Sequence, residues 1–521
     1  MKRNYLYIAP LYLLFLFTSC EKLQYDDPLH YTTEEALATV TDYYYQLARS
    51  SFQSVVFYSN DGYYFGAGLD MLSDQYTNTN RVQQWWDFAY EPRKTLNNSQ
   101  SYGGVYNFSI PYQVFYQANL DATKVLDGLH AGNKGIDGDG NDRTDEIYAF
   151  AHLVQGIAQG YLGAIYDRGI IVDTEEGDSE HSFNNSYKEL IENGVAHLDS
   201  AIAHANAASS ITGADFYTGV NLTKATFIQF ANSLAARLLA AIPRSKDEAA
   251  ALGSTFWGRV YTYASNGITE NLLAEPYAGS GSFYNYGIYY SLLTASSAPY
   301  LQADIKIPYF ADTTGAYPYD YPTDESVVLD PVATNDNRFA TYFKYYSGFG
   351  YLRTDRGRNL FSNYGHYRWG TSASNFAYSQ NQPLFLAEEV RLLRAEAKFW
   401  QGDYTSAAAE LNSASADRKA NGGLGDVPAS EAALRYVLHY EYSIGIAVAG
   451  SAINPFAFMR RNNLLQAGTA TEYPIPEQQI LLTDQSVYTF GGTDNEGQTG
   501  KWGEITTAGS DWGWKGSKVA Y

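Results

Sequence analysis

The chain has 521 residues, of which 35 are Lys or Arg and 56 are Asp or Glu, so its formal net charge is −21. A protein this acidic cannot hold a polyanion by counterion release, and we expect no nucleic-acid partner. The single cysteine, Cys20, excludes intramolecular disulfides and cysteine-based zinc sites. Tyrosine, with 48 residues, outnumbers Lys and Arg together and suits contact surfaces that are partly apolar and partly wet.

The N-terminus has the layout of a secretory signal: a basic start, an apolar run at 5–17 and small residues before a break. The run is shorter than the ~20 residues that a membrane-spanning helix needs. Phe17-Thr18-Ser19-Cys20 resembles a bacterial lipobox, which implies cleavage before Cys20 and acylation of its thiol. We expect a signal peptide at 1–19 and a lipidated acidic tether at 20–30; an ordinary secretory signal with a chance cysteine is the alternative.

Helical periodicity dominates two parts of the mature chain, at 109–265 and 384–447. An earlier helix opens at Thr32, where a Thr N-cap precedes two acids. Pro111 is expected in the first turn of its helix. The helices expected in the two parts span 111–129, 146–166, 186–206, 223–242, 247–265, 384–401, 404–420 and 429–446.

Gly156, Gly160 and Gly163 share one face of the helix expected at 146–166. In a chain with no membrane span, this spacing predicts close packing of two helices rather than a membrane dimer.

An Asp/Gly loop precedes that helix and resembles the front of an EF-hand calcium loop. Alternating oxygen ligands suit Ca²⁺, a hard cation that takes 6–8 oxygens. Asp142 stands where the invariant Gly belongs, and Tyr148 stands where the last Glu belongs, so a solvated acidic turn is the alternative. A bound calcium would be structural, and its candidate ligands are Asp137, Asp139, Asn141 and Asp145.

Between 276 and 383 the long helices give way to a stretch rich in Tyr, Gly, Ser, Asn and Pro. Insertions of this length are usually functional or disordered, and the aromatic content argues against disorder.

The stretch from Ala387 to Tyr404 resembles a tetratricopeptide helix pair, in which Gly402-Asp403-Tyr404 forms the turn between two nested helices. The helix pairs at 143–167 with 186–206 and at 223–242 with 247–265 are candidates for degenerate copies. An ordinary helical hairpin is the alternative.

Two stretches combine aromatic rings with the polar side chains that a neutral sugar needs. Because neighbouring residues point about 100° apart on a helix and to opposite faces of a strand, two adjacent tryptophans cannot both be platforms. The alternative is that these aromatics fill a loop-rich core. The candidate ligand-binding residues are Tyr64, Asp70, Asp74, Trp85 and Trp86 in the first stretch and Tyr284, Tyr289, Arg368 and Trp369 in the second.

Neither a zincin His-Glu-x-x-His, nor a Gly-x-Ser-x-Gly elbow, nor a P-loop occurs in the sequence. We therefore expect no catalytic residues, no required cofactor and no enzymatic activity. A pair of glycosidase carboxylates leaves no trace in sequence, so a surface glycosidase stays an alternative.

A lipobox signal followed by an interrupted helical repeat with aromatic insertions resembles the SusD/RagB family, surface nutrient-binding lipoproteins of Bacteroidetes. Tyr440-Glu441-Tyr442 is all that remains of the family's glutamate-rich stretch, and its Gln-Asn-Pro-Gly-Tyr ending is absent, as in a divergent member. The segments that resemble the family pattern, in its order, are 112–119, 151–166, 222–224 with 230–238, 335–338, 388–404, 459–461 and 473–476.

The resemblance implies a mainly α fold: one SusD-like domain at 31–521, with a tetratricopeptide-like scaffold and long aromatic-rich loop insertions. It implies capture of a ligand without bond cleavage, and delivery to a SusC-like TonB-dependent transporter in the outer membrane. The protein would be lipid-anchored and surface-exposed. We expect an oligosaccharide ligand; a peptide ligand, or a purely structural lipoprotein, is the alternative.

Overall fold

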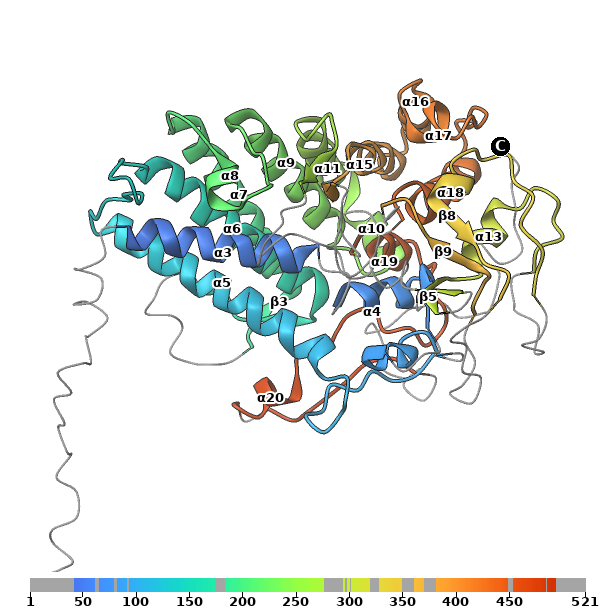
Figure 1. Cartoon of the computed structure of the whole chain (residues 1–521), viewed down its shortest axis with the longest axis horizontal. Helices are drawn as coiled ribbons and strands as arrows, with labels where there is room; N and C mark the ends of the chain where they lie inside the picture. The colour runs from blue at the N-terminus through green and yellow to red at the C-terminus, as the bar shows by residue number, and fades with distance from the viewer. Residues whose placement is uncertain are drawn as a thin grey trace, which may run out of the picture.

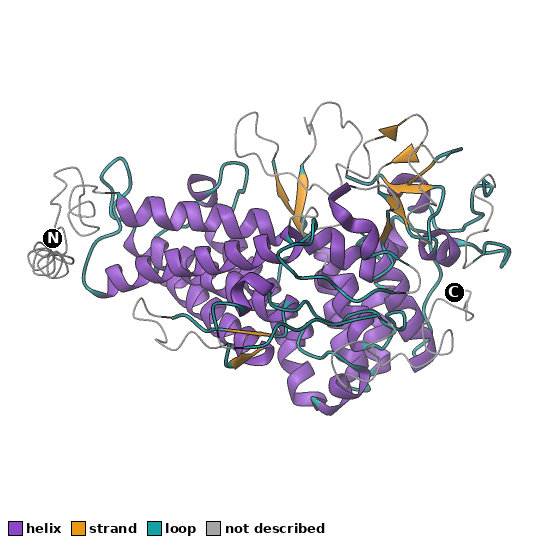
Figure 2. Cartoon of the chain, turned by 90° about the horizontal axis from the view of Figure 1, so that it is seen from below, coloured by secondary structure: helices purple, strands orange, loops and turns teal. Residues whose placement is uncertain are grey.

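The computed structural model is mainly helical, and its strands are short and scattered (Figures 1 and 2). Cys20, Tyr64, Tyr284, Tyr289 and the expected helix start at Thr32 lie outside the described residues. The residues that the structure describes are 42–60, 65–78, 82–90, 93–173, 183–275, 294–295, 298–299, 301–318, 328–348, 360–369, 381–447, 453–483 and 485–492.

Helices form most of the described chain. The longer helices are α3 (Tyr43–Ser59), α5 (Tyr106–His130), α6 (Thr144–Ile165), α7 (Tyr187–Ala207), α9 (Lys224–Ala240), α11 (Gly253–Ser265), α15 (Ala387–Trp400), α16 (Tyr404–Asn412), α18 (Glu431–Tyr440) and α19 (Ile453–Arg461). The shorter helices are α4 (Phe65–Leu72), η1 (Val82–Asp87), α8 (Gly213–Phe216), α10 (Lys246–Ala251), α13 (Lys306–Ala311), α14 (Phe339–Tyr342), α17 (Asp417–Ala420), the π-helical turn η3 (Glu441–Gly445) and α20 (Glu477–Ile480).

Successive long helices pack on one another to form a helical scaffold, which consists of α3, α5, α6, α7, α9, α11, α15 and α16 (Figure 1). Helix α6 packs between α5 and α7, α7 packs on α9, and α9 packs on α11. Helix α15 then packs directly on α11, although the chain makes a long excursion between Ser265 and Ala387. The scaffold therefore continues across the excursion, as a helical repeat with an insertion requires.

The glycines of α6 produce the close helix packing that their spacing predicts. A Cβ on Gly160 would lie 2.3 Å from Leu238 of α9, and one on Gly156 would lie 2.7 Å from Leu198 of α7. Gly194 of α7 completes the crossing, because a Cβ there would meet the Gly160 backbone nitrogen at 2.8 Å. The backbones of α6 and α7 therefore touch without side chains between them.

The turn between α15 and α16 forms at Gly402-Asp403, as predicted. Gly402 adopts φ +76°, a left-handed conformation that glycine enters without a steric cost at the end of a helix. Asp403 then caps α16 by accepting a hydrogen bond from the Ser406 backbone nitrogen at 3.0 Å.

Several predicted helix boundaries are wrong. Helix α5 begins at Tyr106, so Pro111 lies inside the helix rather than in its first turn. The helix expected at 247–265 is divided by Gly253, whose φ of +69° breaks the helical path. Three other expected helices also differ. Strand β10 (Gln382–Phe385) replaces the start of the helix expected at 384–401, and the helix expected at 404–420 is divided into α16 and α17. The helix expected at 429–446 ends in the π-helical turn η3.

Within the described part of the chain, the strands form five separate two-stranded antiparallel sheets. One of them, β4 with β10, closes the base of the excursion, because Ala274 before it pairs with Gln382 after it. The strands are β1 (Tyr76–Thr77) with β7 (Gln302–Ala303), β2 (Arg168–Gly169) with β3 (Asn185–Ser186), β4 (Leu272–Ala274) with β10 (Gln382–Phe385), β5 (Thr294–Ala295) with β6 (Ala298–Pro299) and β8 (Phe343–Tyr345) with β9 (Tyr364–His366).

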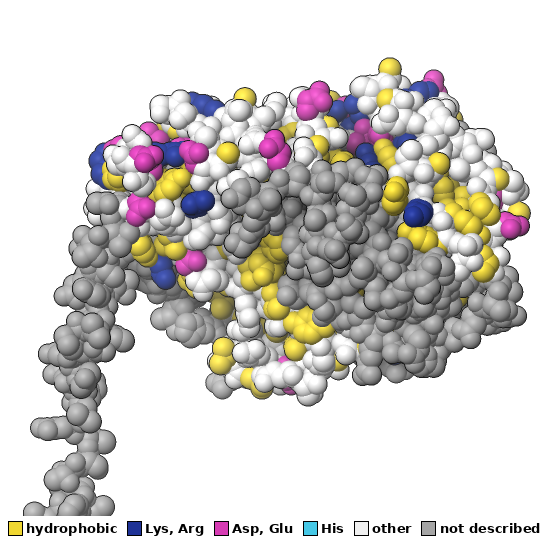
Figure 3. Space-filling model, in the orientation of Figure 1, with side chains coloured by type: hydrophobic (Ala, Val, Ile, Leu, Met, Phe, Trp, Pro, Cys, Tyr) yellow, Lys and Arg dark blue, Asp and Glu magenta, His cyan; other side chains and the backbone are white. Residues whose placement is uncertain are grey.

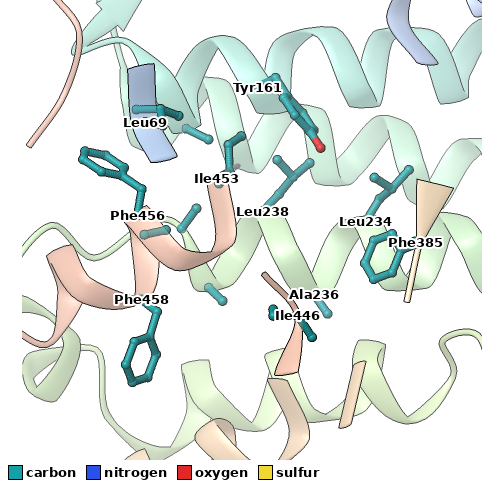
Figure 4. Close-up of a cluster of buried hydrophobic side chains, with 14 of the residues drawn as sticks. Leu69, Tyr161, Leu234, Ala236, Leu238, Phe385, Ile446, Ile453, Phe456 and Phe458 are labelled. Carbon is teal, nitrogen blue, oxygen red and sulfur yellow. The ribbon is translucent and has the colours of Figure 1, made fainter. Parts of the chain in front are cut away.

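The core joins the scaffold to segments that are distant in sequence. Figure 4 shows Phe456 of α19 and Leu69 of α4 on one side of a cluster that also contains Leu238 of α9. Beside it, the fully buried Arg237 of α9 makes a bidentate ion pair with Glu389 of α15, with both N–O distances at 2.7 Å. Within the described ranges, no helix combines the length and apolar character needed to cross a bilayer.

Candidate functional site

A cavity of about 470 Å³ lies between α13, α18 and the loops that follow α13 and precede α14. We call it the α13–α18 cavity; these helices lie at the right-hand end of the molecule in Figure 1. Its volume is within the ~300–1,000 Å³ of small-molecule sites. On the face shown in Figure 3, charged side chains are scattered over the helical side, and hydrophobic side chains gather in patches toward the right.

Three aromatic rings form the wall of the cavity. Tyr436 and Tyr440 are four residues apart on α18, so they lie on the same face of the helix. Phe310 of α13 stacks near Tyr440, with ring centroids 6.2 Å apart, and meets Tyr436 edge-on at 5.8 Å. Tyr436 is only half-buried, so part of its ring faces the open cavity.

Small polar groups form the exposed rim. Thr313, Thr314 and Asn335 are exposed and line the opening. The first part of the rim is a fixed turn, because the Asp312 carboxylate accepts hydrogen bonds from the Thr314 backbone nitrogen at 2.9 Å, the Thr314 hydroxyl at 2.7 Å and the Tyr317 backbone nitrogen at 3.0 Å. The rim therefore presents hydroxyl and amide groups on a rigid loop.

A buried ion network forms the floor. Arg338, which is 1 % exposed, donates to both carboxylate oxygens of Glu441 at 2.7 and 3.0 Å. It also donates to Asp336 at 2.7 Å and to Asp417 at 3.0 Å. The Tyr440 hydroxyl donates to Asp336 at 2.8 Å, which joins the aromatic wall to the network.

Burial and the neighbouring charges shift the pKa values of this network. Burial lowers the pKa of Arg418, whose Nε lies 3.5 Å from Glu441. Burial also raises the pKa of Glu441, although Arg338 opposes that shift. For Arg338 the attraction of Glu441 and Asp336 outweighs burial, so its pKa is raised. The ion pairs therefore outweigh the effect of burial for Arg338, and oppose it only in part for Arg418 and Glu441.

Asp70 and Asp74, both from the first predicted ligand stretch, are buried, as is Trp85 of the same stretch. Asp70 and Asp74 are 3 % and 0 % exposed, and burial raises the pKa of Asp70 to about 8. Asp74 forms an ion pair with Arg93 and accepts a hydrogen bond from Gln466 at 2.7 Å. In this conformation neither carboxylate reaches a surface ligand, because partners far along the chain draw Asp74 into the core and Asp70 is buried in helix α4.

The two tryptophans diverge, as their adjacency requires. Trp85 is 0 % exposed and donates its indole N–H to Asn107 at 3.2 Å, so it is a core residue here and not a platform. Trp86 is half-buried and keeps a partly accessible ring. The ligand-binding role of Trp86 stays a prediction.

Arg368 and Trp369, from the second stretch, lie together but outside the α13–α18 cavity. The Arg368 guanidinium lies 3.9 Å from the ring centre of Tyr342 and 4.9 Å from that of Trp369. It donates to the Gly445 carbonyl at 2.6 Å and approaches Asp417 to 3.9 Å. Both residues are half-buried beside a small hollow, and their role in ligand binding stays a prediction.

The predicted calcium loop is closed by its own hydrogen bonds. One Asp137 oxygen accepts from the backbone nitrogens of Asp139 and Asn141 at 3.0 and 2.8 Å, and hydrogen bonds from Asn141 lower the pKa of Asp137. Asp145 is exposed in the first turn of α6. Among the described residues, no three His, Cys, Asp or Glu side chains are grouped to hold a metal ion. Calcium binding stays a prediction.

Sequence reasoning did not identify the cavity, although two of its segments had been singled out by resemblance. Segment 335–338 supplies Asp336 and Arg338, and segment 440–442 supplies Glu441. The four-residue spacing of Tyr436 and Tyr440 was the remaining signal. Nothing in the sequence shows that these segments meet.

The chain resembles several solved structures across most of its length, although no protein-family model and no curated protein matches it. A SusD superfamily protein from Parabacteroides distasonis has a TM-score of 0.58 at 13 % identity, covering 88 % of this chain and 100 % of that one. A SusD-like carbohydrate-binding protein from Bacteroides vulgatus has a TM-score of 0.54 at 14 % identity, covering 81 % and 83 %. Surface glycan-binding protein A from Bacteroides fluxus has a TM-score of 0.52 at 12 % identity, covering 86 % and 98 %.

At these identities the likeness concerns the three-dimensional fold. The mainly α architecture with a tetratricopeptide-like scaffold, predicted from the sequence, is confirmed. The chain therefore has the fold of the SusD superfamily.

Proposed function

We propose that this protein is a lipoprotein of the bacterial outer-membrane surface that binds an oligosaccharide and delivers it to a SusC-like TonB-dependent transporter. The observation that carries the binding part is the α13–α18 cavity, where aromatic rings face an opening rimmed by hydroxyl and amide groups. Solved proteins of this fold include ones named as carbohydrate-binding and glycan-binding, which supports the same reading.

The lining of the cavity is complementary to both the apolar faces and the hydroxyl groups of a sugar. The C–H faces of a sugar ring pack on an aromatic ring, for which Tyr436 is the accessible partner. Sugar hydroxyls both donate and accept hydrogen bonds, and the side chains of Thr313, Thr314 and Asn335 lie at the opening to meet them. A site of this kind binds by shape and hydrogen bonding, with few charged contacts.

We propose binding without bond cleavage. Glycosidases use two carboxyl groups with separate roles, one as acid and one as base or nucleophile. Here Asp336 and Glu441 are both held by the guanidinium of Arg338 and are 2 % and 0 % exposed. Neither is presented to a glycosidic bond in this conformation.

The membrane and transporter parts of the proposal rest on the sequence. Acylation of Cys20 would anchor the chain, because acyl chains gain ~0.8 kcal/mol per buried CH₂ and several on one residue hold stably. Replacing Cys20 with Ala is expected to release the protein from the membrane fraction. Co-purification of the wild type with a TonB-dependent barrel would support delivery to a transporter.

The test of glycan binding uses the mature lipoprotein in detergent. In affinity gels that contain different polysaccharides, at least one polysaccharide should slow the migration of the protein. Calorimetry with the matching oligosaccharide should show heat of binding, and the length of the glycan should be unchanged afterwards. Tyr436→Ala should weaken binding about 10-fold or more, since sugar stacking on one ring contributes on the order of 1 kcal/mol or more. Tyr261→Ala, which alters a half-buried tyrosine of α11 in the scaffold, is the matched control.

Each remaining outcome contradicts a defined part of the proposal. Shortened glycan products would replace it with a glycosidase. Heat from a casein peptide pool, with no retardation by any glycan, would replace the oligosaccharide with a peptide. No binding of either ligand would favour a structural lipoprotein.

A further inference from the structure

Carboxylates outnumber cations in the lining of the α13–α18 cavity, which contains Asp312, Asp336 and Glu441. Arg418 is the one basic residue among the described residues that line the cavity, and it is 1 % exposed. Its Nη1 donates to the Gly425 carbonyl at 2.8 Å, and its Nε faces Glu441 at 3.5 Å. The cavity therefore offers no exposed cation to an anionic ligand.

The carboxylates of the lining are equally committed. Asp336 and Glu441 share the guanidinium of Arg338, and Asp336 also accepts from the Tyr440 hydroxyl. Asp312 accepts three hydrogen bonds within its own turn. An anionic ligand would be placed beside these three carboxylates, with no exposed cation among the described lining residues to offset them.

One buried donor on the cavity lining still lacks a hydrogen-bond acceptor. The Nε–H of Arg418 is inaccessible to solvent and makes no hydrogen bond to a protein atom, since Glu441, 3.5 Å away, attracts it only as an opposite charge. Leaving a buried donor without a hydrogen bond is unfavourable. An uncharged hydroxyl oxygen, from a ligand or a water molecule, could accept this bond without bringing a second charge into the network.

We infer that the α13–α18 cavity selects an uncharged, hydroxyl-rich ligand, a neutral oligosaccharide segment, and rejects uronic-acid and sulfated sugars. This inference rests on the proposed function and names its substrate class. Aromatic stacking on Tyr436 and hydrogen bonds at the rim provide the affinity, and the excess of carboxylates over accessible cations provides the selection.

The test compares matched oligosaccharides on the mature lipoprotein in detergent. The neutral set contains malto-, cello-, xylo- and manno-oligosaccharides; oligogalacturonides and chondroitin sulfate fragments are the anionic set, and deacetylated chito-oligosaccharides are the cationic set. We expect Tyr436-dependent binding of a neutral member. Anionic members of equal length should bind about 100-fold more weakly, because their charge would lie beside carboxylates of the same sign, and cationic members should not show this loss.

A rim substitution tests the electrostatic part separately. Asn335→Lys places a cation at the exposed rim, and we expect it to strengthen oligogalacturonide binding about 10-fold while the aromatic wall is kept. Asn266→Lys makes the same change of charge at an exposed site after α11 and should leave binding unchanged. Equal effects of the two lysines would contradict selection by local charge.

The failures of the inference and of the proposed function give different results. Tyr436-dependent binding of an anionic glycan, as tight as that of any neutral one, overturns the inference and leaves glycan capture standing. Neutral binding that Tyr436→Ala does not change also overturns the inference, because the site is then elsewhere. If none of the glycans binds to the wild type, the proposed function fails and the inference fails with it.

Discussion

The α6–α7 crossing of the helical scaffold and the region around the α13–α18 cavity are stabilised in different ways. At the α6–α7 crossing, Gly160 and Gly194 bring two backbones into contact, and uncharged polar side chains also join the two helices, since Asn193 donates a hydrogen bond to Gln159 at 2.6 Å. At the cavity floor, Arg338 joins three carboxylates that come from α17, η3 and the loop before α14. One region is stabilised by close packing and the other by compensated charge.

This difference matters for binding. A close-packed helix pair has no room for a ligand, and a change of one methyl group is felt there. Charged groups hold loops at fixed positions while leaving space between them, as Arg338 does beneath the cavity. Arg338 thus fixes two residues of the cavity lining, Asp336 and Glu441, in place.

The largest expected effect breaks the charged region. Arg338→Met removes the shared cation and leaves Asp336 and Glu441 buried with only Arg418, 3.5 Å from Glu441, beside them, which should lower the free energy of unfolding by about 3–5 kcal/mol. Urea unfolding followed by circular dichroism measures it. Arg259→Met is the control, since its ion pair with Glu192 is about 40 % exposed and is worth ~0–1 kcal/mol. Similar losses for the two variants would show that the network is not a main stabilising feature.

The second prediction concerns pH. Burial raises the pKa of Glu388 to about 7, well above that of an unfolded glutamate, and its Oε1 has no hydrogen-bond partner. Between pH ~4.5 and ~7 the folded state keeps a proton that the unfolded state has released, so stability falls as the pH rises through this window. Ionisation of Glu388 should therefore lower the free energy of unfolding by on the order of 2 kcal/mol between pH 5 and pH 8.

Glu388→Gln tests that assignment, because glutamine does not titrate. Urea unfolding at pH 5, 6, 7 and 8 should show a shallower decline for the variant than for the wild type. Parallel curves would mean that Glu388 is ionised in the folded protein at all four pH values, and that its surroundings, which include Arg391 at 3.2 Å, accommodate the charge.

The smallest expected effect concerns the close-packed region. Gly194→Ala puts a methyl group 2.8 Å from the Gly160 backbone nitrogen, and overpacking of ~1–3 kcal/mol is offset by ~1 kcal/mol of helix propensity. We expect a net loss of about 1 kcal/mol in the free energy of unfolding. Gly258→Ala on α11 meets only the flexible Gln401 side chain at 3.3 Å and should instead stabilise by up to ~1 kcal/mol. The same sign for both would contradict backbone contact at the crossing.

Part of the candidate site was within reach of sequence reasoning and part was not. The adjacency of Trp85 and Trp86 correctly predicts that they diverge, because it depends only on local geometry. The burial of Asp70 and Asp74 was missed. The partner of Asp74, Gln466, lies nearly four hundred residues further along the chain, and no local pattern connects them.

The sequence by itself determined the main helices of the scaffold, the glycine face of α6 and the turn at Gly402-Asp403. Each depends on residues within one or two helical turns of one another, so periodicity and capping preferences are sufficient. Only the tertiary structure decided the rest: the pairing of β4 with β10 that closes the excursion, and the convergence of Arg338, Asp417 and Glu441 beneath the cavity. Those contacts join distant segments, and ion pairs and cavities depend on where folding brings charges and rings together in space.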